Sequence, residues 1–79
     1  MTTGQLLDVL RPEIARVFSS RAYRNSQGER ILLIDMTYPD DIDPTVVFIR
    51  EHAPALTVDV ISLRPYALGR RIVVSGFSR

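Results

Sequence analysis

The apolar run Ile31–Ile34 constrains the fold of this chain more than any other segment. Successive side chains of a β-strand point to opposite faces of the sheet, so four apolar residues in a row need cover on both faces. We therefore expect a central strand here. Beyond the run, apolar and polar residues alternate as far as Tyr38, which is the period of a strand with one buried face.

The segment from Thr3 to Phe18 has the pattern of an amphipathic helix. Its apolar residues recur at spacings of three and four. Thr2 and Thr3 are both placed to cap the first turn, and Gln5 lies three residues after Thr2, as in a capping box. Pro12 interrupts this pattern, because proline removes a backbone donor and crowds the preceding turn. We therefore expect a kink or a break near Arg11, and we favour a kink within one helix because the apolar stripe keeps its phase across Pro12.

A second helix is predicted after the proline- and aspartate-rich segment 39–44. Asp43 fits the N-cap, and Pro44 fits the first helical position, where the missing N–H costs nothing. We expect this helix to run to about His52, because Ala53 precedes a proline and such residues avoid helical backbone angles.

Three further strands complete the predicted fold. Apolar residues alternate with polar ones from Leu56 to Val60, which predicts a strand up to about Leu63, and a last strand is predicted over 71–77. A short strand over 21–24 would pair with the central strand through the turn 25–28. The sequence therefore predicts an α+β fold in the order α-(β)-β-α-β-β, a sheet of three or four strands with two helices on one face. Whether the strand after the second helix returns parallel or antiparallel stays open.

Length and composition favour one small domain over residues 1–79 in a reducing compartment. A domain this small in an oxidising compartment usually contains disulfides, and this chain of 79 residues has no cysteine. Its first 18 residues lack the pattern of a signal peptide, and no apolar stretch approaches the roughly 20 residues that span a bilayer. We therefore expect a cytoplasmic protein without membrane contact, of the kind that phages and mobile elements often encode.

The residues that usually carry catalysis are sparse, so we expect neither an enzyme nor a cofactor. His52 is the only histidine, and its place near the end of a helix suits a structural role. The four glycines match no phosphate- or dinucleotide-binding motif. The aspartates 35, 40, 41 and 43 lack the spacing of a calcium loop, and we interpret the last three as helix-cap charges, so no metal site is predicted.

All ten basic residues are arginine, and most of them flank two predicted turns. We expect these two turns to lie at one end of the sheet, with the acidic segment 40–43 at the other end. Arginines beside tyrosines are typical of protein interfaces and also form stacking surfaces for nucleic acid. The candidate partner-binding residues are Arg21, Tyr23, Arg24, Arg30, Arg64, Tyr66, Arg70 and Arg71.

Two functional hypotheses follow from these observations. The first is a non-enzymatic protein-interaction module, such as an adaptor, an inhibitor or an assembly component, which acts by surface complementarity. Self-association is expected as well, because a core of this size is marginal and an exposed sheet edge favours further pairing. The alternative is a nucleic-acid-binding protein that uses the arginine-rich end, although the isoelectric point of about 8.3 is low for that class.

Overall fold

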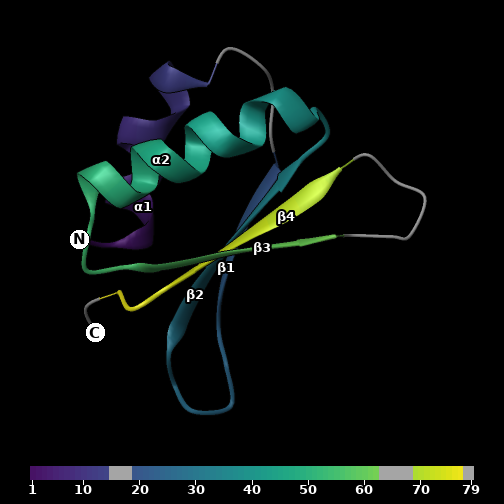
Figure 1. Cartoon of the computed structure of the whole chain (residues 1–79). Helices are drawn as coiled ribbons and strands as arrows, with labels where there is room; N and C mark the ends of the chain where they lie inside the picture. The colour runs from purple at the N-terminus through teal and green to yellow at the C-terminus, as the bar shows by residue number, and fades with distance from the viewer. Residues whose placement is uncertain (15–18, 63–68, 78–79) are drawn as a thin grey trace.

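The computed structural model describes residues 1–14, 19–62 and 69–77 (Figure 1). It contains two α-helices, two short 3-10 turns and four strands. In chain order these are α1 (Thr3–Leu10), η1 (Arg11–Glu13), β1 (Ser19–Arg24), β2 (Arg30–Met36), η2 (Pro39–Asp41), α2 (Ile42–His52), β3 (Thr57–Ser62) and β4 (Arg70–Ser75). The predicted α+β class and the predicted element order are confirmed, including the short strand before the first turn.

The four strands form one sheet in the order β1-β2-β4-β3, and every neighbouring pair is antiparallel. Because β4 is antiparallel to both of its neighbours, β2 and β3 run in the same direction with β4 between them. The connection through α2 is therefore a split β-α-β unit, which answers the question that the sequence left open. As predicted, the apolar run Ile31–Ile34 lies in a central strand.

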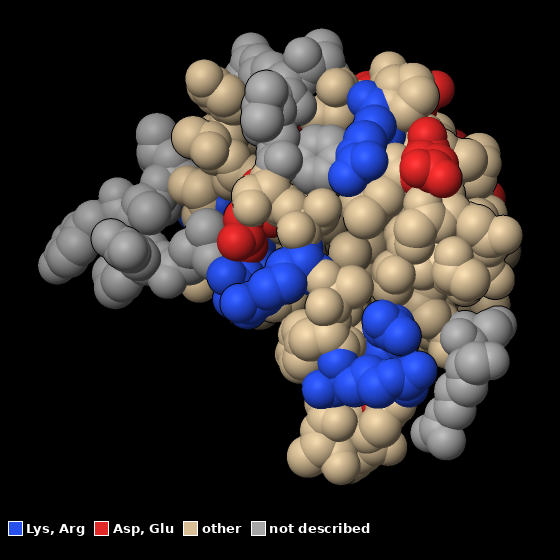
Figure 2. Space-filling view, turned by 180° about the vertical axis from the view of Figure 1, so that it is seen from behind, with Lys and Arg blue, Asp and Glu red and all other residues tan. Residues whose placement is uncertain are grey.

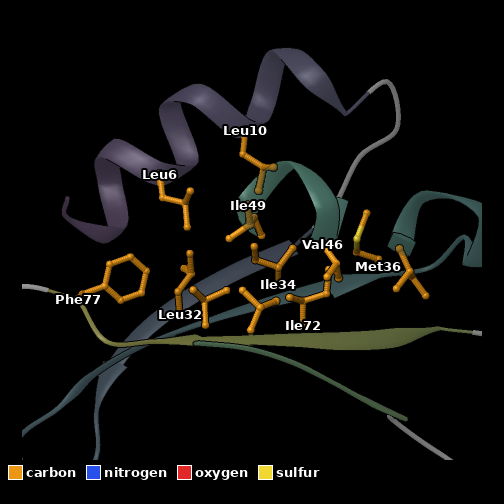
Figure 3. Close-up of a cluster of buried hydrophobic side chains, with 12 residues drawn as sticks. Leu6, Leu10, Leu32, Ile34, Met36, Val46, Ile49, Ile72 and Phe77 are labelled. Carbon is orange, nitrogen blue, oxygen red and sulfur yellow. The ribbon is translucent and has the colours of Figure 1, made fainter. Parts of the chain in front are cut away.

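Both helices cover the same face of the sheet, and one apolar core fills the space between the layers (Figure 3). The middle inward positions of the two central strands are fully buried. Leu6 and Leu10 of α1 and Ile49 of α2 are fully buried against them. The fully buried strand residues are Leu32, Ile34, Ile72 and Val74. This layer fixes which side chains face the helices and, by alternation, which face away.

Helix α1 is shorter than the sequence pattern predicts. Thr2 and Gln5 form the capping box, with reciprocal hydrogen bonds of 2.8 and 3.1 Å between side chain and backbone. The helix ends at Leu10, a 3-10 turn containing Pro12 follows, and Ile14 is extended. The predicted kink is therefore wrong, because the proline ends the α-helix at this point. The rest of the predicted helix, residues 15–18, lies outside the described residues.

Helix α2 begins earlier than predicted and ends where predicted. Its first residue is Ile42 and its N-cap is Asp41, so the prediction that Asp43 caps the helix is wrong. The preceding 3-10 turn starts at Pro39 and feeds directly into α2, which moves the helix start two residues upstream. The helix ends at His52, before Ala53 and the proline that follows it.

The β1–β2 hairpin closes through the predicted turn. The Asn25 side-chain oxygen accepts hydrogen bonds from the backbone N–H groups of Gln27 and Glu29, at 3.0 and 2.9 Å. Gly28 has a φ of 79°, a backbone conformation that glycine adopts without steric cost. This turn fixes the register in which β1 lies against β2, and therefore which residues of β1 share a face with the central strands.

Shortening a side chain should destabilise the protein more on the helix-covered face of the sheet than on the other face. Ile72→Ala should lower the free energy of unfolding by about 2–5 kcal/mol, because it leaves a cavity in the core. Ile61→Ala, on the neighbouring strand but 47% exposed, should cost much less. Chemical denaturation of both variants measures the difference. Equal losses of stability would contradict the assignment of the core to one face.

Candidate functional site

The face of the sheet that points away from the helices is the candidate functional site. We call it the open face. Its side chains follow from the strand registers and from alternation along each strand. They are Ser19, Arg21 and Tyr23 of β1, Ile31, Leu33 and Asp35 of β2, Arg71, Val73 and Ser75 of β4, and Thr57, Asp59 and Ile61 of β3.

A groove of about 510 Å³ lies on the open face. Its lining comes from all four strands and consists of Arg21, Tyr23, Leu33, Ile61, Arg71 and Val73. Leu33 and Val73 are neighbours on the two central strands and form its apolar middle. The edge strands contribute Tyr23, which is 42% exposed, and Ile61, which is 47% exposed. The groove is thus apolar in the middle and has arginine side chains on its rim.

One ion pair fixes an arginine of this groove. Arg71 Nε donates to Asp35 Oδ1 at 2.7 Å, and Arg71 Nη2 donates to Asp35 Oδ2 at 3.1 Å. The two residues lie directly opposite each other on β2 and β4, which gives the bidentate geometry. The hydrogen bonds from Arg71 hold the pKa of the Asp35 carboxyl below its ordinary value of 3.8, against the opposing effect of desolvation.

The charges of the open face balance. Its described strand positions carry two arginines, Arg21 and Arg71, and two aspartates, Asp35 and Asp59. Arg71 is paired with Asp35, whereas Arg21 acts on that carboxylate through space. The net charge of these twelve positions is therefore zero. Such a face suits a partner that carries both signs of charge better than one that is uniformly negative.

The structure does not gather the predicted arginine-bearing turns at one end of the sheet. Arg24 and Arg30 pair at the tip of the β1–β2 hairpin. Arg70 pairs with Ser62 at the opposite end of the strands, beside the β3–β4 connection. The expected single basic end is therefore wrong. The reason is the split β-α-β unit. β2 begins at the β1–β2 turn, and β3, which runs parallel to β2, ends at the β3–β4 connection. The two connections therefore leave the sheet from opposite ends.

The candidate residues divide among several surfaces. Arg21, Tyr23 and Arg71 come together on the open face. Arg24 donates to the Gly28 carbonyl at 3.1 Å, and Arg70 donates to the Gly69 carbonyl at 3.1 Å. Arg64 and Tyr66 lie outside the described residues. On the side seen in Figure 2, basic surface forms separate patches, one of them touching acidic surface.

The sequence pattern does not reveal the apolar residues of the groove or the aspartate that pairs with Arg71. The pattern assigns Leu33, Val73 and Ile61 only to strands, and it groups Asp35 with the aspartates near the second helix. The alternation of each strand was visible in the sequence. The pairing that brings β4 beside β2 was not visible, since the contact between Asp35 and Arg71 joins residues that are 36 positions apart.

The described residues contain no group of three or more potential metal ligands, and within them no buried side-chain polar atom lacks a hydrogen-bond partner. Asp35 belongs to the open face, away from the acidic segment 40–43. The ring of His52 stacks on Phe48 with 4.8 Å between the ring centroids. None of the helices in the described part of the chain is long and apolar enough to cross a membrane.

A second hollow, of about 230 Å³, lies between the end of α1 with η1 and the start of α2. It is lined in part by Glu13, Thr45 and Phe48. The buried Thr45 hydroxyl donates to the Asp41 carbonyl at 2.6 Å, so it is already satisfied. This hollow is smaller than the groove on the open face and presents no reactive pair of side chains.

Comparison with known proteins gives no relative: no family model, no curated protein and no solved structure matches this chain.

The Asp35–Arg71 pair predicts a pH-dependent difference in stability. The folded-state pKa of Asp35 lies below its ordinary value, so the pair stabilises the fold above that value and the stabilisation is lost as the pH falls through the folded pKa. Asp35→Asn should therefore lower the Tm most at about pH 7 and progressively less toward about pH 2. Thermal unfolding followed by circular dichroism measures this difference.

Asp8→Asn is the matched control for this measurement, because Asp8 is an exposed aspartate on α1, outside the open face. Its effect on the Tm should be small throughout the pH range. If the effect of Asp35→Asn were the same at every pH, the ion pair would not be the source of the difference.

Proposed function

We propose that this chain is a non-enzymatic protein-interaction module that binds its partner with the open face. The observation that supports this proposal is the groove of about 510 Å³, in which an apolar middle adjoins two arginines and an exposed tyrosine. Apolar surface surrounded by polar side chains is typical of a binding site. Tyrosine and arginine are also the residue types that most often dominate the binding energy of protein interfaces.

The position of Arg71 supports the proposal further. A free arginine loses side-chain entropy when a partner immobilises it. Arg71 is already held by two hydrogen bonds to Asp35, so much of this loss has occurred before binding. Leu33, only 7% exposed in the middle of the groove, gives the site a fixed floor.

An adaptor, an inhibitor or an assembly component would each fit an interaction module of this size. All three act by complementary contact and need no cofactor. The cytoplasmic location and the phage or mobile-element origin remain predictions from the sequence, which rest on the absence of cysteine and on small size.

One observation favours the alternative of nucleic-acid binding. Tyr23 and Arg21 lie on the same face of β1, and an exposed aromatic ring beside a guanidinium group is a stacking surface for bases. The neutral charge of the open face argues for protein instead, because phosphate contacts supply most of the affinity in nonspecific nucleic-acid binding. We therefore place protein binding first.

Site-specific photocrosslinking tests the proposed function. A photoreactive phenylalanine in place of Tyr23 should give discrete protein crosslinks in cells that express this chain naturally, and Ile61→Asp in the same chain should abolish them. The matched control carries the photoreactive residue in place of Tyr38, which is 48% exposed and lies outside the open face. The same products from both positions, or no products from Tyr23, would overturn the proposal.

A nucleic-acid titration tests the alternative. Fluorescence anisotropy with labelled single-stranded DNA and RNA of about 20 nucleotides should show no binding at about 50 mM salt, where phosphate contacts are strongest. Binding that weakens steeply with salt and is lost in Tyr23→Ala and Arg21→Ala would support the nucleic-acid hypothesis against protein binding.

A further inference from the structure

Two rows of side chains on the open face carry charges that are arranged antisymmetrically across the sheet. One row crosses all four strands in the order β1-β2-β4-β3 and consists of Arg21, Leu33, Val73 and Asp59. Its ends carry opposite charges, and its two middle positions are apolar. The midline of the sheet, between β2 and β4, therefore separates a basic half-row from an acidic half-row of equal length.

The neighbouring row shows the same kind of antisymmetry at its centre. Its members, in strand order, are Ser19, Asp35, Arg71 and Ile61. Asp35 and Arg71 lie on opposite sides of the midline and carry opposite charges. Two adjacent rows thus change sign across one line parallel to the strands.

A face with this pattern is complementary to itself. Consider a second copy related by a two-fold axis that lies between the two sheets, parallel to the strands and over the midline. The rotation places β1 of one copy over β3 of the other and β2 over β4, row by row. Arg21 then lies over Asp59 of the other copy, Leu33 over Val73, and Asp35 over Arg71, and each contact occurs twice.

The other in-plane two-fold axis, perpendicular to the strands, gives the opposite result. It places every strand over its own copy. When it passes through the first row, it sets Arg21 over Arg21 and Asp59 over Asp59, and like charges in contact oppose binding. Charge complementarity therefore selects the axis parallel to the strands.

We propose that the partner on the open face is a second copy of this chain, in a two-fold dimer whose axis runs parallel to the strands between β2 and β4. This inference rests on the proposed function and names its partner. In the dimer, Arg21 forms an ion pair with Asp59 of the other copy at both edges of the interface. Face-to-face sheets rotate by about 30° relative to each other, and the long arginine side chain spans the resulting offset.

The area of the open face can be compared with the area that stable protein interfaces bury. Four strands spaced about 4.8 Å apart, with five or six residues of about 3.3 Å each, give a face of roughly 300–400 Å² in projection. Stable interfaces commonly bury about 800 Å² of accessible surface on each partner. The face is therefore small for an interface, and we expect a dimer whose population depends on the protein concentration.

Charge reversal tests this arrangement by sedimentation equilibrium of the purified full chain at concentrations from about 10 μM to 1 mM. Arg21→Asp and Asp59→Arg should each weaken homodimerisation at least about tenfold, since each places like charges together at both edges. An equimolar mixture of the two variants should form a heterodimer, and the double variant Arg21→Asp/Asp59→Arg should again form a homodimer. The control is Glu51→Arg, which makes the same charge change at an exposed position of α2 and should dimerise normally.

Rescue by mixing and by the double variant distinguishes this contact from misfolding, and circular dichroism confirms that each variant is folded. A parent chain that stays monomeric at about 1 mM overturns the inference. If the Tyr23 crosslinks to a different protein persist in that case, the proposed function stands without the dimer. A dimer that neither reversal weakens also overturns the inference, because it would use another surface.

Discussion

The central strand β2 is apolar on both faces, so both faces must be covered by other side chains. The rest of the fold depends on this requirement. The run Ile31–Ile34 places two apolar side chains on each face of β2. The helices bury Leu32 and Ile34 completely on one face. On the other face, only neighbouring side chains cover Ile31 and Leu33 among the described residues, and these include the tyrosine and arginines of the groove. The same run that organises the core thus places two apolar side chains, each 7% exposed, on the open face.

The insertion of β4 between β2 and β3 decides the chemistry of that open face. It brings Arg71 against Asp35, sets Val73 beside Leu33, and moves the basic turns to opposite ends of the sheet. The result is a neutral face with ordered charges. Contact with another protein, and specifically with a second copy, explains this order better than attraction of a polyanion does.

Much of the fold was predictable from local patterns, whereas the site was not. The strong apolar run, the Asn25–Gly28 turn and the proline after Ala53 act over a few residues, and each prediction from them was confirmed. The prediction of a kink near Pro12 was wrong because the apolar stripe continues in the sequence beyond the end of α1. The prediction that the arginine-bearing turns lie at one end of the sheet was wrong for a different reason. The end of the sheet at which each turn lies depends on strand order, which is a long-range property. Given the order β1-β2-β4-β3, alternation alone would have placed Arg21, Leu33, Val73 and Asp59 in one row.

Methyl NMR spectra recorded as the protein is diluted show whether the open face contacts a second copy, as we propose. The methyl resonances of Leu33, Val73 and Ile61 should shift with concentration, because the dimer covers them. Those of Leu6 and Ile49, buried beneath the helices, should stay fixed. Open-face methyl resonances that do not move across the concentration range, or shifts confined to methyl groups on the helical side, would contradict the account.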